Sequence, residues 1–424
     1  MYSWYRLLTY LFYPFAPIYL YFRKIKKKED FYGCKEKLSK IDKKRGEGFL
    51  VWFHVASIGE AISIFPLIAN YEKEKKIDKI LITSITLSSS KLLKKKYKNS
   101  TKVIHQFLPL DISKLVNKFL NHWKPNLSIF IDSEIWPTLI FQIKKRGIPL
   151  LLINARITKK TFNRWMLLKN FAKEIFEKFD LSIASNKETE NYLRILGAKN
   201  IKNYGNLKFS NSEIIQNNKL NPLVINKIKN RKVWCAASTH SSEELICAKT
   251  HIELKRKYSN VLTIIIPRHI HRVEKIKKEL LSLNLNVTLY NKIDNFNNDT
   301  DILLIDAYGE SLKFYNFVKC VFLGKSLIKS LIMDSGQNPL EAARYGCKIF
   351  HGPNVSNFTE IYDYLTSLDA ANKITNIEEL TMSLDKEFER EKKKNEEIVE
   401  KIENYGKNIL NNILGEIKRY INNH

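Results

Sequence analysis

The sequence predicts an α/β protein with two doubly wound domains that face each other across a cleft, preceded by an N-terminal membrane anchor helix. Short apolar runs alternate with amphipathic helical patterns in two series, which is typical of parallel sheets buried on both faces. A polar stretch rich in asparagine and lysine separates the two series. A length of 424 residues agrees with more than one domain.

The N-terminal segment, residues 1–28, contains six basic residues and no acidic one. Its uncharged middle is interrupted by Pro14 and Pro17 and is shorter than the roughly 20 apolar residues of a straight spanning helix. Its aromatic residues suit a membrane interface, and the basic cluster that follows favours a cytoplasmic location for the rest of the chain. We therefore expect an uncleaved anchor that spans the membrane or lies in its interface, with a buried aromatic helix as the alternative.

The remaining chain divides into four parts. The first series of apolar runs defines a domain at residues 46–209, and the second defines a domain at residues 233–383. Residues 210–232 are the predicted linker, and residues 384–424 carry an isoleucine stripe that predicts a C-terminal helical segment packing on the body. The predicted strands are 49–55, 80–83, 127–131, 150–153 and 181–184 in the first domain, and 233–236, 261–266, 287–290, 302–305 and 320–323 in the second.

Composition narrows the choice of partners. The net charge of +27 predicts an anionic partner, which is a nucleic acid, a membrane surface or a phosphorylated substrate. The five cysteines form no Cys-x-x-Cys pair, which argues against a zinc ribbon, a redox motif or a disulfide scaffold. The sequence contains no recognised nucleic-acid-binding motif, so we expect no nucleic-acid partner.

In the first domain, polar residues follow predicted strands, where ligands of doubly wound domains bind. Ser57, Gly59 and Glu60 form a strand-to-helix turn, and a carboxylate at a helix start is favoured in its charged form, which can accept a proton. The alternative is a glutamate that only caps the helix. Asp132 and Glu134 follow a later strand and either act as an acid–base pair, position a sugar, or cap the next helix. Arg156 adds a cation at the same edge.

In the second domain, the corresponding turns favour a phosphate-containing ligand. Arg268, after Pro267 at the end of an apolar run, is placed to bind a phosphate in a bidentate manner. Backbone N–H groups at a helix that opens near Pro339 favour a phosphate, and Glu341 favours ribose hydroxyls. The recurrence of such turns in both domains predicts a nucleotide-sugar site between them. The remaining candidate residues are Tyr308, Gly309, Glu310, Asn338 and Leu340.

These motifs, in this order, resemble the Kdo transferases of lipid A assembly, the 3-deoxy-D-manno-octulosonic-acid transferases. The matching pieces lie at residues 54–60, 108–111, 132–137, 154–156, 205–208, 238–240, 267–269 and 338–341. The aromatic, basic N-terminus agrees with the family as well.

The resemblance implies an inverting, metal-independent glycosyltransferase of the GT-B fold, with two Rossmann-like domains and no cofactor. It implies transfer of Kdo from CMP-Kdo to a lipid A precursor, lipid IVA, in lipopolysaccharide core biosynthesis at the cytoplasmic side of the inner membrane. By position, Glu60 matches the family's proton acceptor. Pro267 and Arg268, the 308–310 turn and residues 338–341 match its CMP-binding segments.

The sequence departs from the family's pattern near the expected donor site. Lys325 stands where a glycine is usual, Gln337 stands where histidine is common, and the 327–335 loop is longer than usual. These differences affect the expected fine specificity rather than the class. A nucleotide-sugar enzyme of the same fold with another donor is the main alternative, and a basic nucleic-acid-binding protein or a nonenzymatic membrane scaffold are the others.

Overall fold

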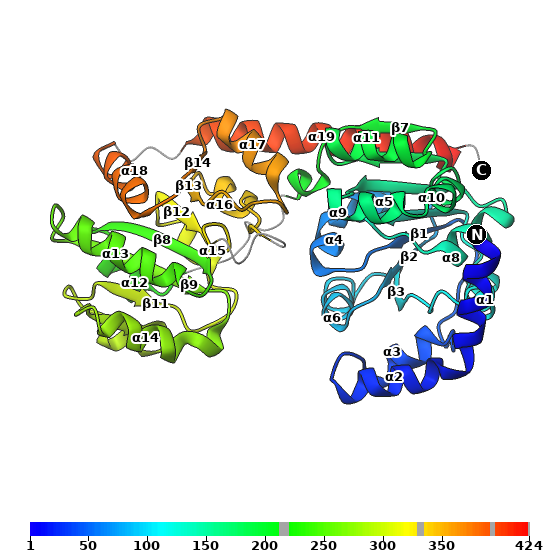
Figure 1. Cartoon of the computed structure of the whole chain (residues 1–424), viewed down its shortest axis with the longest axis horizontal. Helices are drawn as coiled ribbons and strands as arrows, with labels where there is room; N and C mark the ends of the chain where they lie inside the picture. Colours follow the sequence, from blue (N-terminus) through cyan, green and yellow to red (C-terminus); the bar gives the residue numbers. More distant parts are fainter. Residues whose placement is uncertain (212–219, 329–334, 391–394, 423–424) are drawn as a thin grey trace. The chain divides into compact units, whose positions relative to one another are not determined.

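The structure is a computed structural model that describes residues 1–211, 220–328, 335–390 and 395–422 (Figure 1). The chain forms two compact units, one comprising Met1–Asn211 with Tyr405–His424 and the other Ser212–Asn404. Each unit is an α/β structure built on a parallel sheet of seven strands. The predicted α/β architecture with two parallel sheets is therefore confirmed.

The sheet of the first unit has the strand order β3-β2-β1-β4-β5-β6-β7. Its central strand β1 pairs in parallel with β2 and β4, so that Trp52 lies opposite Leu81 on one side and Ser128 on the other. Fully buried Trp52 packs against Phe119 and Phe130 on one face of the sheet, and its neighbour Phe53 packs against Tyr71 on the other. The strands are β1 (Leu50–His54), β2 (Lys79–Ser84), β3 (Val103–Phe107), β4 (Leu127–Ile131), β5 (Leu150–Ala155), β6 (Leu181–Ala184) and β7 (Ile201–Asn203).

Helices cover both faces of this sheet, as the near-continuous apolar character of its strands requires. Because every strand runs in the same direction, the turns that lead from a strand into a helix lie at the carboxyl edge of the sheet. The helices are α4 (Ile58–Ser63), α5 (Phe65–Lys73), α6 (Leu87–Lys96), α7 (Ser113–Trp123), α8 (Pro137–Lys145), α9 (Lys159–Met166), α10 (Lys169–Phe176) and α11 (Lys187–Leu196), followed by the 3₁₀ turn η2 (Leu207–Ser210).

The sheet of the second unit has the order β10-β11-β9-β8-β12-β13-β14. Its core lies around the fully buried Trp234 and Phe322 of two neighbouring strands. The strands are β8 (Lys232–Thr239), β9 (Val261–Pro267), β10 (Val287–Leu289), β11 (Ile302–Leu304), β12 (Cys320–Leu323), β13 (Lys348–His351) and β14 (Ala371–Lys373). The helices are α12 (Pro222–Ile228), α13 (Glu243–Lys255), α14 (Val273–Leu281), α15 (Ser311–Tyr315), α16 (Leu340–Arg344), α17 (Thr359–Ser367) and α18 (Ile377–Glu389), with the 3₁₀ turns η4 (Ile270–Arg272) and η5 (Tyr290–Asn295).

Two predicted segments have a defined structure of their own. Part of the predicted linker, residues 212–219, lies outside the described residues, but the linker also contains α12, whose Val224 and Ile228 are buried. The C-terminal isoleucine stripe lies on α19 (Glu396–Asn422). Its second half packs on the first unit, where Tyr405 contacts Phe209 edge-on.

The N-terminal segment forms α1 (Tyr2–Phe12), the 3₁₀ turn η1 (Tyr13–Phe15), α2 (Ala16–Ile25) and α3 (Phe31–Lys37), and these helices belong to the first unit (Figure 1). The direction of the chain changes between α1 and α2 (Figure 1), and a proline lies in the first turn of both η1 and α2. Buried Glu29 accepts hydrogen bonds from Arg23 and Lys37 and so holds α2 and α3 together. Within the described part of the chain, no helix is both long enough and apolar enough to cross a membrane.

Candidate functional site

Glu60 lies in the first turn of α4, directly after the carboxyl end of β1. Ser57 caps this helix, because its Oγ accepts a hydrogen bond of 3.3 Å from the Glu60 N–H. The Glu60 carboxylate in turn accepts hydrogen bonds from the Ala56 N–H at 2.7 Å and from the Ser57 hydroxyl at 2.8 Å. This reciprocal arrangement is similar to a capping box, except that the carboxylate accepts from the N–H of the residue before the N-cap, and it holds the carboxylate in a defined position at the edge of the sheet.

The surroundings of Glu60 favour its protonated form more than water does. Burial raises the pKa of Glu60 to about 7, and the nearby carboxylates of Asp132 and Glu134 add to this effect, while the hydrogen bonds from Ala56 and Ser57 oppose it. A half-buried carboxylate with a pKa near neutrality can take up a proton from a substrate at neutral pH. The capping role and the proton-accepting role are therefore compatible in the same residue.

Glu134 forms a second polar group at this edge. Its carboxylate accepts hydrogen bonds from His54 Nε2 at 3.1 Å and from Trp136 Nε1 at 2.9 Å. Burial alone would raise the pKa of Glu134, but the hydrogen bonds and the charge of His54 outweigh it and lower the pKa below its ordinary value. Thr83 Oγ1 lies 2.9 Å from His54 Nδ1 and accepts a hydrogen bond from Trp52 Nε1, so the imidazole contacts a side chain at each of its ring nitrogens. Glu134 and Glu60 are thus two carboxylates with opposite pKa shifts.

Asp132 interacts electrostatically with both of these carboxylates and with two cations. Its backbone adopts a left-handed conformation, with φ of 62°, and its side chain accepts a hydrogen bond from the Ser133 hydroxyl. Burial raises the pKa of Asp132, whereas the positive charges of Lys208 and Arg156 oppose the rise. The structure therefore brings the predicted residues Ser57, Gly59, Glu60, Asp132, Glu134 and Arg156 to one edge of one sheet.

In the second unit, Pro267 ends β9 and Arg268 follows it at the carboxyl edge. The Arg268 N–H donates to the Thr239 carbonyl at 3.0 Å, which ties this turn to the neighbouring strand β8, while the side chain is exposed. Its guanidinium lies near Glu341. Burial raises the pKa of Glu341, and the positive charges of Arg344 and Arg268 partly oppose this rise. Arg268 and Glu341, predicted from separate motifs, are thus close in space.

The turn at residues 308–310 follows β11 at the same edge. Tyr308 is 66% exposed, and Gly309 has a φ of 81°, which is the left-handed region that favours glycine. Glu310 is ion-paired with Lys313 at 2.8 Å. The exposed tyrosine ring is the side chain of this turn that is available to a ligand.

Residues 338–341 differ from the sequence-based expectation in one respect. Helix α16 has only five residues, and the Leu340 N–H donates to Asn338 Oδ1 at 3.2 Å. The Leu340 N–H, one of the groups expected to bind a phosphate, is thus bound to the Asn338 side chain. Pro339, at the helix start, has no N–H group. One N–H at the start of α16 is therefore bound within the protein.

Glu243 and Glu244, at the start of α13, hold the loops of the second unit in place. Fully buried Glu243 accepts hydrogen bonds from the N–H groups of His240, Lys325, Ser326 and Leu327, at 2.9, 2.7, 3.0 and 3.1 Å. Glu244 accepts two hydrogen bonds of 3.0 Å from the Arg272 guanidinium. The turn after β12 is therefore bound by a carboxylate from within the protein, and these N–H groups are occupied.

Lys325 occupies a backbone position that suits glycine. Its φ is 58°, in the left-handed region, which explains physically why a glycine is favourable there. Its positive charge lies close enough to His240 to lower the pKa of that imidazole, after burial as the main cause. Of the 327–335 loop, residues 329–334 lie outside the described residues.

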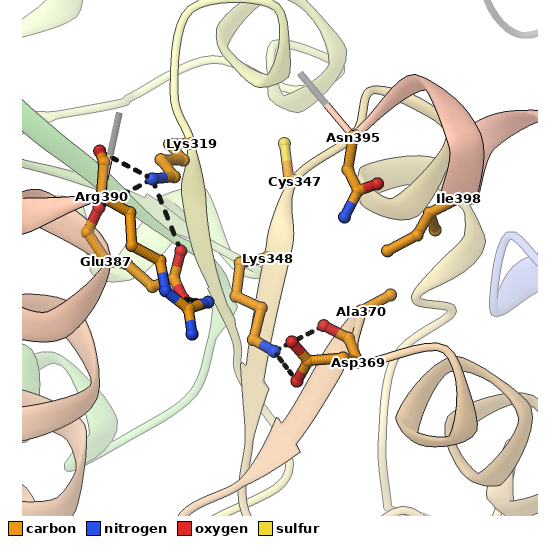
Figure 2. Close-up of a pocket in the computed structure, with 10 residues that line it drawn as sticks. Lys319, Cys347, Lys348, Asp369, Ala370, Glu387, Arg390, Asn395 and Ile398 are labelled. Carbon is orange, nitrogen blue, oxygen red and sulfur yellow. Dashed lines mark hydrogen bonds and ion pairs between the residues drawn. The ribbon is translucent and has the colours of Figure 1, made fainter. Parts of the chain in front are cut away.

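A hollow of about 150 Å³ in the second unit is not part of this edge (Figure 2). It lies where β12, β13 and β14 begin, at the opposite edge of the sheet from Arg268. Figure 2 shows its charged side chains paired with one another: Lys348 with Asp369, and Lys319 and Arg390 with Glu387. These ion pairs stabilise the start of the strands and leave no unpaired charge for a substrate.

Several residues of the two edges were not predicted as site residues. His54 and Lys208 lie inside motifs that the sequence analysis noted, but their roles depend on partners that are distant in the chain. Buried Asp111 accepts hydrogen bonds from the N–H groups of Thr138 and Leu139 and from the Tyr5 hydroxyl, and so caps α8 from outside. Among the residues that the structure describes, no group of three or more histidine, cysteine, aspartate or glutamate side chains could hold a metal ion.

Comparison with known proteins identifies the fold and the family. A glycosyltransferase from Rickettsia africae has a TM-score of 0.56 at 12% identity and covers 89% of this chain and 100% of that chain. A UDP-GlcNAc 2-epimerase from Neisseria meningitidis bound to UDP-GlcNAc has a TM-score of 0.58 at 14% identity, with 89% and 100% covered. The two parallel seven-stranded sheets, with polar residues at their carboxyl edges, define a protein of the GT-B-like class.

The family follows from sequence similarity. Residues 32–211 match the family model of 3-deoxy-D-manno-octulosonic-acid transferase (kdotransferase). The 3-deoxy-D-manno-octulosonic acid transferase of Rickettsia bellii is 32% identical over 381 residues, which are 90% of this chain and 89% of that protein. That of Haemophilus influenzae is 30% identical over 333 residues, covering 76% and 75%. The chain belongs to the Kdo transferase family and is a Kdo glycosyltransferase.

Proposed function

We propose that this enzyme transfers Kdo from CMP-Kdo to a lipid A precursor, lipid IVA, with inversion at the anomeric carbon. The observation that carries this proposal is the Glu60 carboxylate, held at the carboxyl edge of the first sheet with a pKa of about 7. The first unit would bind the acceptor and supply the base, and the second unit would bind the donor through Pro267, Arg268, the 308–310 turn and residues 338–341.

The proposed reaction is a single displacement. A sugar hydroxyl oxygen of the acceptor forms a bond to the anomeric carbon of Kdo while the bond from that carbon to the CMP phosphate oxygen breaks. The hydroxyl proton passes to Glu60, and CMP leaves with the electron pair of the broken bond. Arg268 would stabilise the negative charge of the departing phosphate, so the scheme requires neither a metal ion nor a cofactor.

The decisive experiment is Kdo transfer from freshly generated CMP-Kdo to a tetraacylated lipid A precursor by purified protein in detergent with excess chelator. Product is expected, and its mass counts the Kdo residues added. Product that forms only after addition of a divalent cation would contradict the metal independence. Folded protein that binds UDP but not CMP would indicate the alternative, a related enzyme with another donor.

Replacing Arg268 by alanine should weaken CMP binding by about tenfold, because one charge-assisted contact to a phosphate contributes about 1.5 kcal/mol or more. Titration calorimetry with CMP measures the change. Arg256→Ala is the matched control, because Arg256, the C-cap residue of α13, is exposed and pairs with Glu253 at the surface. Unchanged CMP affinity in Arg268→Ala would remove Arg268 from the phosphate site.

The pH dependence of Kdo transfer should follow the protonation state of the Glu60 carboxylate. A general base acts in its deprotonated form, so kcat/KM is expected to rise with pH and level off above about 7. In Asp132→Asn the loss of a nearby negative charge lowers the pKa of Glu60. The acidic limb of the profile of kcat/KM against pH should therefore move to lower pH. Ser133→Ala, which retains the Asp132 carboxylate, serves as the control. A limb that stays in place in Asp132→Asn would show that Asp132 does not set this pKa.

We also propose that the enzyme acts at the cytoplasmic face of the inner membrane, attached through its N-terminal helices to an anionic lipid surface. Trp4, Leu8 and Tyr21 are among the exposed large side chains of α1 and α2, at 71%, 65% and 61%. Exposed lysines on α6 (Lys91, Lys94) add positive charge on the same unit. Sedimentation with vesicles that contain phosphatidylglycerol checks this attachment, and protein that remains in the supernatant would contradict it.

A further inference from the structure

A groove in the first unit lies between α1 and the first turns of α7. Its volume is about 650 Å³. The side chains that line it are Ser3, Arg6, Leu7 and Tyr10 from α1 and Ser113, Lys114 and Asn117 from α7. Both helices belong to the same unit, and buried Leu115 and Ile112 pack on Ala16 beside the groove and hold the N-terminal segment on α7. The groove is therefore a stable feature of this unit.

The polar side of the groove is cationic. Arg6 and Lys114 are exposed, and no acidic residue lines the groove. Within the described ranges neither of these two cations forms an ion pair, although Lys114 lies over the Tyr13 ring at 5.0 Å. Ser3 and Ser113 also line the groove, and their hydroxyls are further donors. This part of the groove is complementary to a phosphate monoanion.

The groove also has an apolar lining, which continues onto the surface of α1. Leu7 and Tyr10 are 47% and 59% exposed, and Leu11 on the same helix is 60% exposed. A small hydrophilic anion would leave these apolar side chains exposed to water, whereas an acyl chain would bury them, which is favourable. The pairing of a cationic end with an apolar extension matches one amphiphile, a lipid with a charged headgroup.

We propose that this groove binds one anionic membrane phospholipid, with its headgroup phosphate between Arg6 and Lys114 and an acyl chain along Leu7 and Tyr10. The proposal goes beyond sugar transfer and rests only on the proposed membrane attachment. A bound lipid would fix α1 in the headgroup region. Tyr5 of α1 donates a hydrogen bond to Asp111, which caps α8, the helix that follows Asp132 and Glu134 in the chain. A lipid that fixes α1 would therefore also restrict the motion of the sheet edge at which Asp132 and Glu134 lie.

The test is native mass spectrometry of the full-length protein in detergent, titrated with phosphatidylglycerol and, separately, with phosphatidylcholine. Wild-type protein should bind one phosphatidylglycerol with saturation and bind phosphatidylcholine more weakly. The double variant R6A/K114A should bind phosphatidylglycerol about thirtyfold more weakly, since each cation near an anionic lipid contributes about 1 kcal/mol. The control K75A/K76A removes the same charge from exposed lysines that follow α5, outside both the groove and the N-terminal helices, and should retain binding. All four residues are exposed, so melting temperatures should remain close to wild type.

Other variants and competitors separate the possible occupants. Leu7→Ser should weaken phosphatidylglycerol binding but leave the weaker binding of glycerol phosphate unchanged. Equal losses in both double variants, or equal binding of the two phospholipids, would overturn the proposal. Displacement by inorganic phosphate at similar concentration would assign the groove to a free anion instead. Stoichiometric displacement by the lipid A precursor would assign it to the acceptor. Since no Kdo is transferred in this experiment, its result is independent of whether the proposed donor and acceptor are correct.

Discussion

Replacing Glu60 by glutamine is expected to lower kcat for Kdo transfer by about 10² to 10⁴-fold while leaving CMP affinity unchanged. The amide cannot accept the proton that the attacking hydroxyl loses. Its carbonyl oxygen can still accept from the Ala56 N–H, so the turn that opens α4 should keep its conformation. Single-turnover transfer and a CMP titration on the same preparation measure the two quantities.

Ser57→Ala is the comparison that separates chemistry from capping. This variant loses the helix cap, worth about 1 kcal/mol of stability, but keeps the Glu60 carboxylate. If Glu60 only capped α4, the two variants would lose activity to a similar extent. Turnover near the wild-type rate in Glu60→Gln would exclude Glu60 as the base, since no other step in the proposed scheme removes the acceptor proton.

Replacing Glu243 by alanine is expected to lower the free energy of unfolding by about 3–5 kcal/mol. The carboxylate is fully buried and accepts hydrogen bonds from four backbone N–H groups, three of them in the turn after β12. Removing it leaves these donors without a partner in a site closed to water and opens a cavity as well. Denaturant unfolding of the wild-type and variant proteins measures the difference.

Two further variants define the cause of that loss. Glu253→Ala, on the same helix, removes a surface carboxylate paired with Arg256 and should change stability by less than about 0.5 kcal/mol. Glu243→Gln keeps one acceptor oxygen but places an amide donor against backbone donors, so it should remain strongly destabilising. A stability loss in Glu243→Ala no larger than that in Glu253→Ala would show that the turn after β12 does not depend on Glu243.

The central strands of both sheets were predictable, and several outer strands were not. All ten apolar runs predicted to be strands overlap a strand of the structure, because a strand covered by helices on both faces needs continuous apolar side chains. β3, β7, β13 and β14 were missed. β7 and β14 are three-residue edge strands with exposed residues, which carry almost no apolar signal. β3 contains His105 and Gln106, which are buried because Ser84 and Trp123, far away in the sequence, hydrogen-bond to them.

The gathering of the candidate residues at the carboxyl edges of the sheets was also predictable, whereas their electrostatics were not. In a parallel sheet each strand ends at the same edge, so polar motifs that follow strands must gather there whatever the details of packing. The sequence does not reveal that Glu134 is paired with His54 or that Asp132 faces Lys208. Nor does the sequence reveal that Glu243 is fully buried and accepts hydrogen bonds from backbone N–H groups of a distant turn, whereas Glu60 is partly exposed at the edge of its sheet.

The sequence by itself determined the two parallel sheets, the edge at which each candidate residue lies and the resemblance to the Kdo transferases. These properties depend on local apolar periodicity and on short motifs. The tertiary structure alone decided which charges are paired, the pKa of Glu60, the short length of α16 and the groove beside Arg6. Such properties depend on distances between residues far apart in the chain, and a carboxylate or a cation has the same identity in the sequence whether it is buried, paired or exposed.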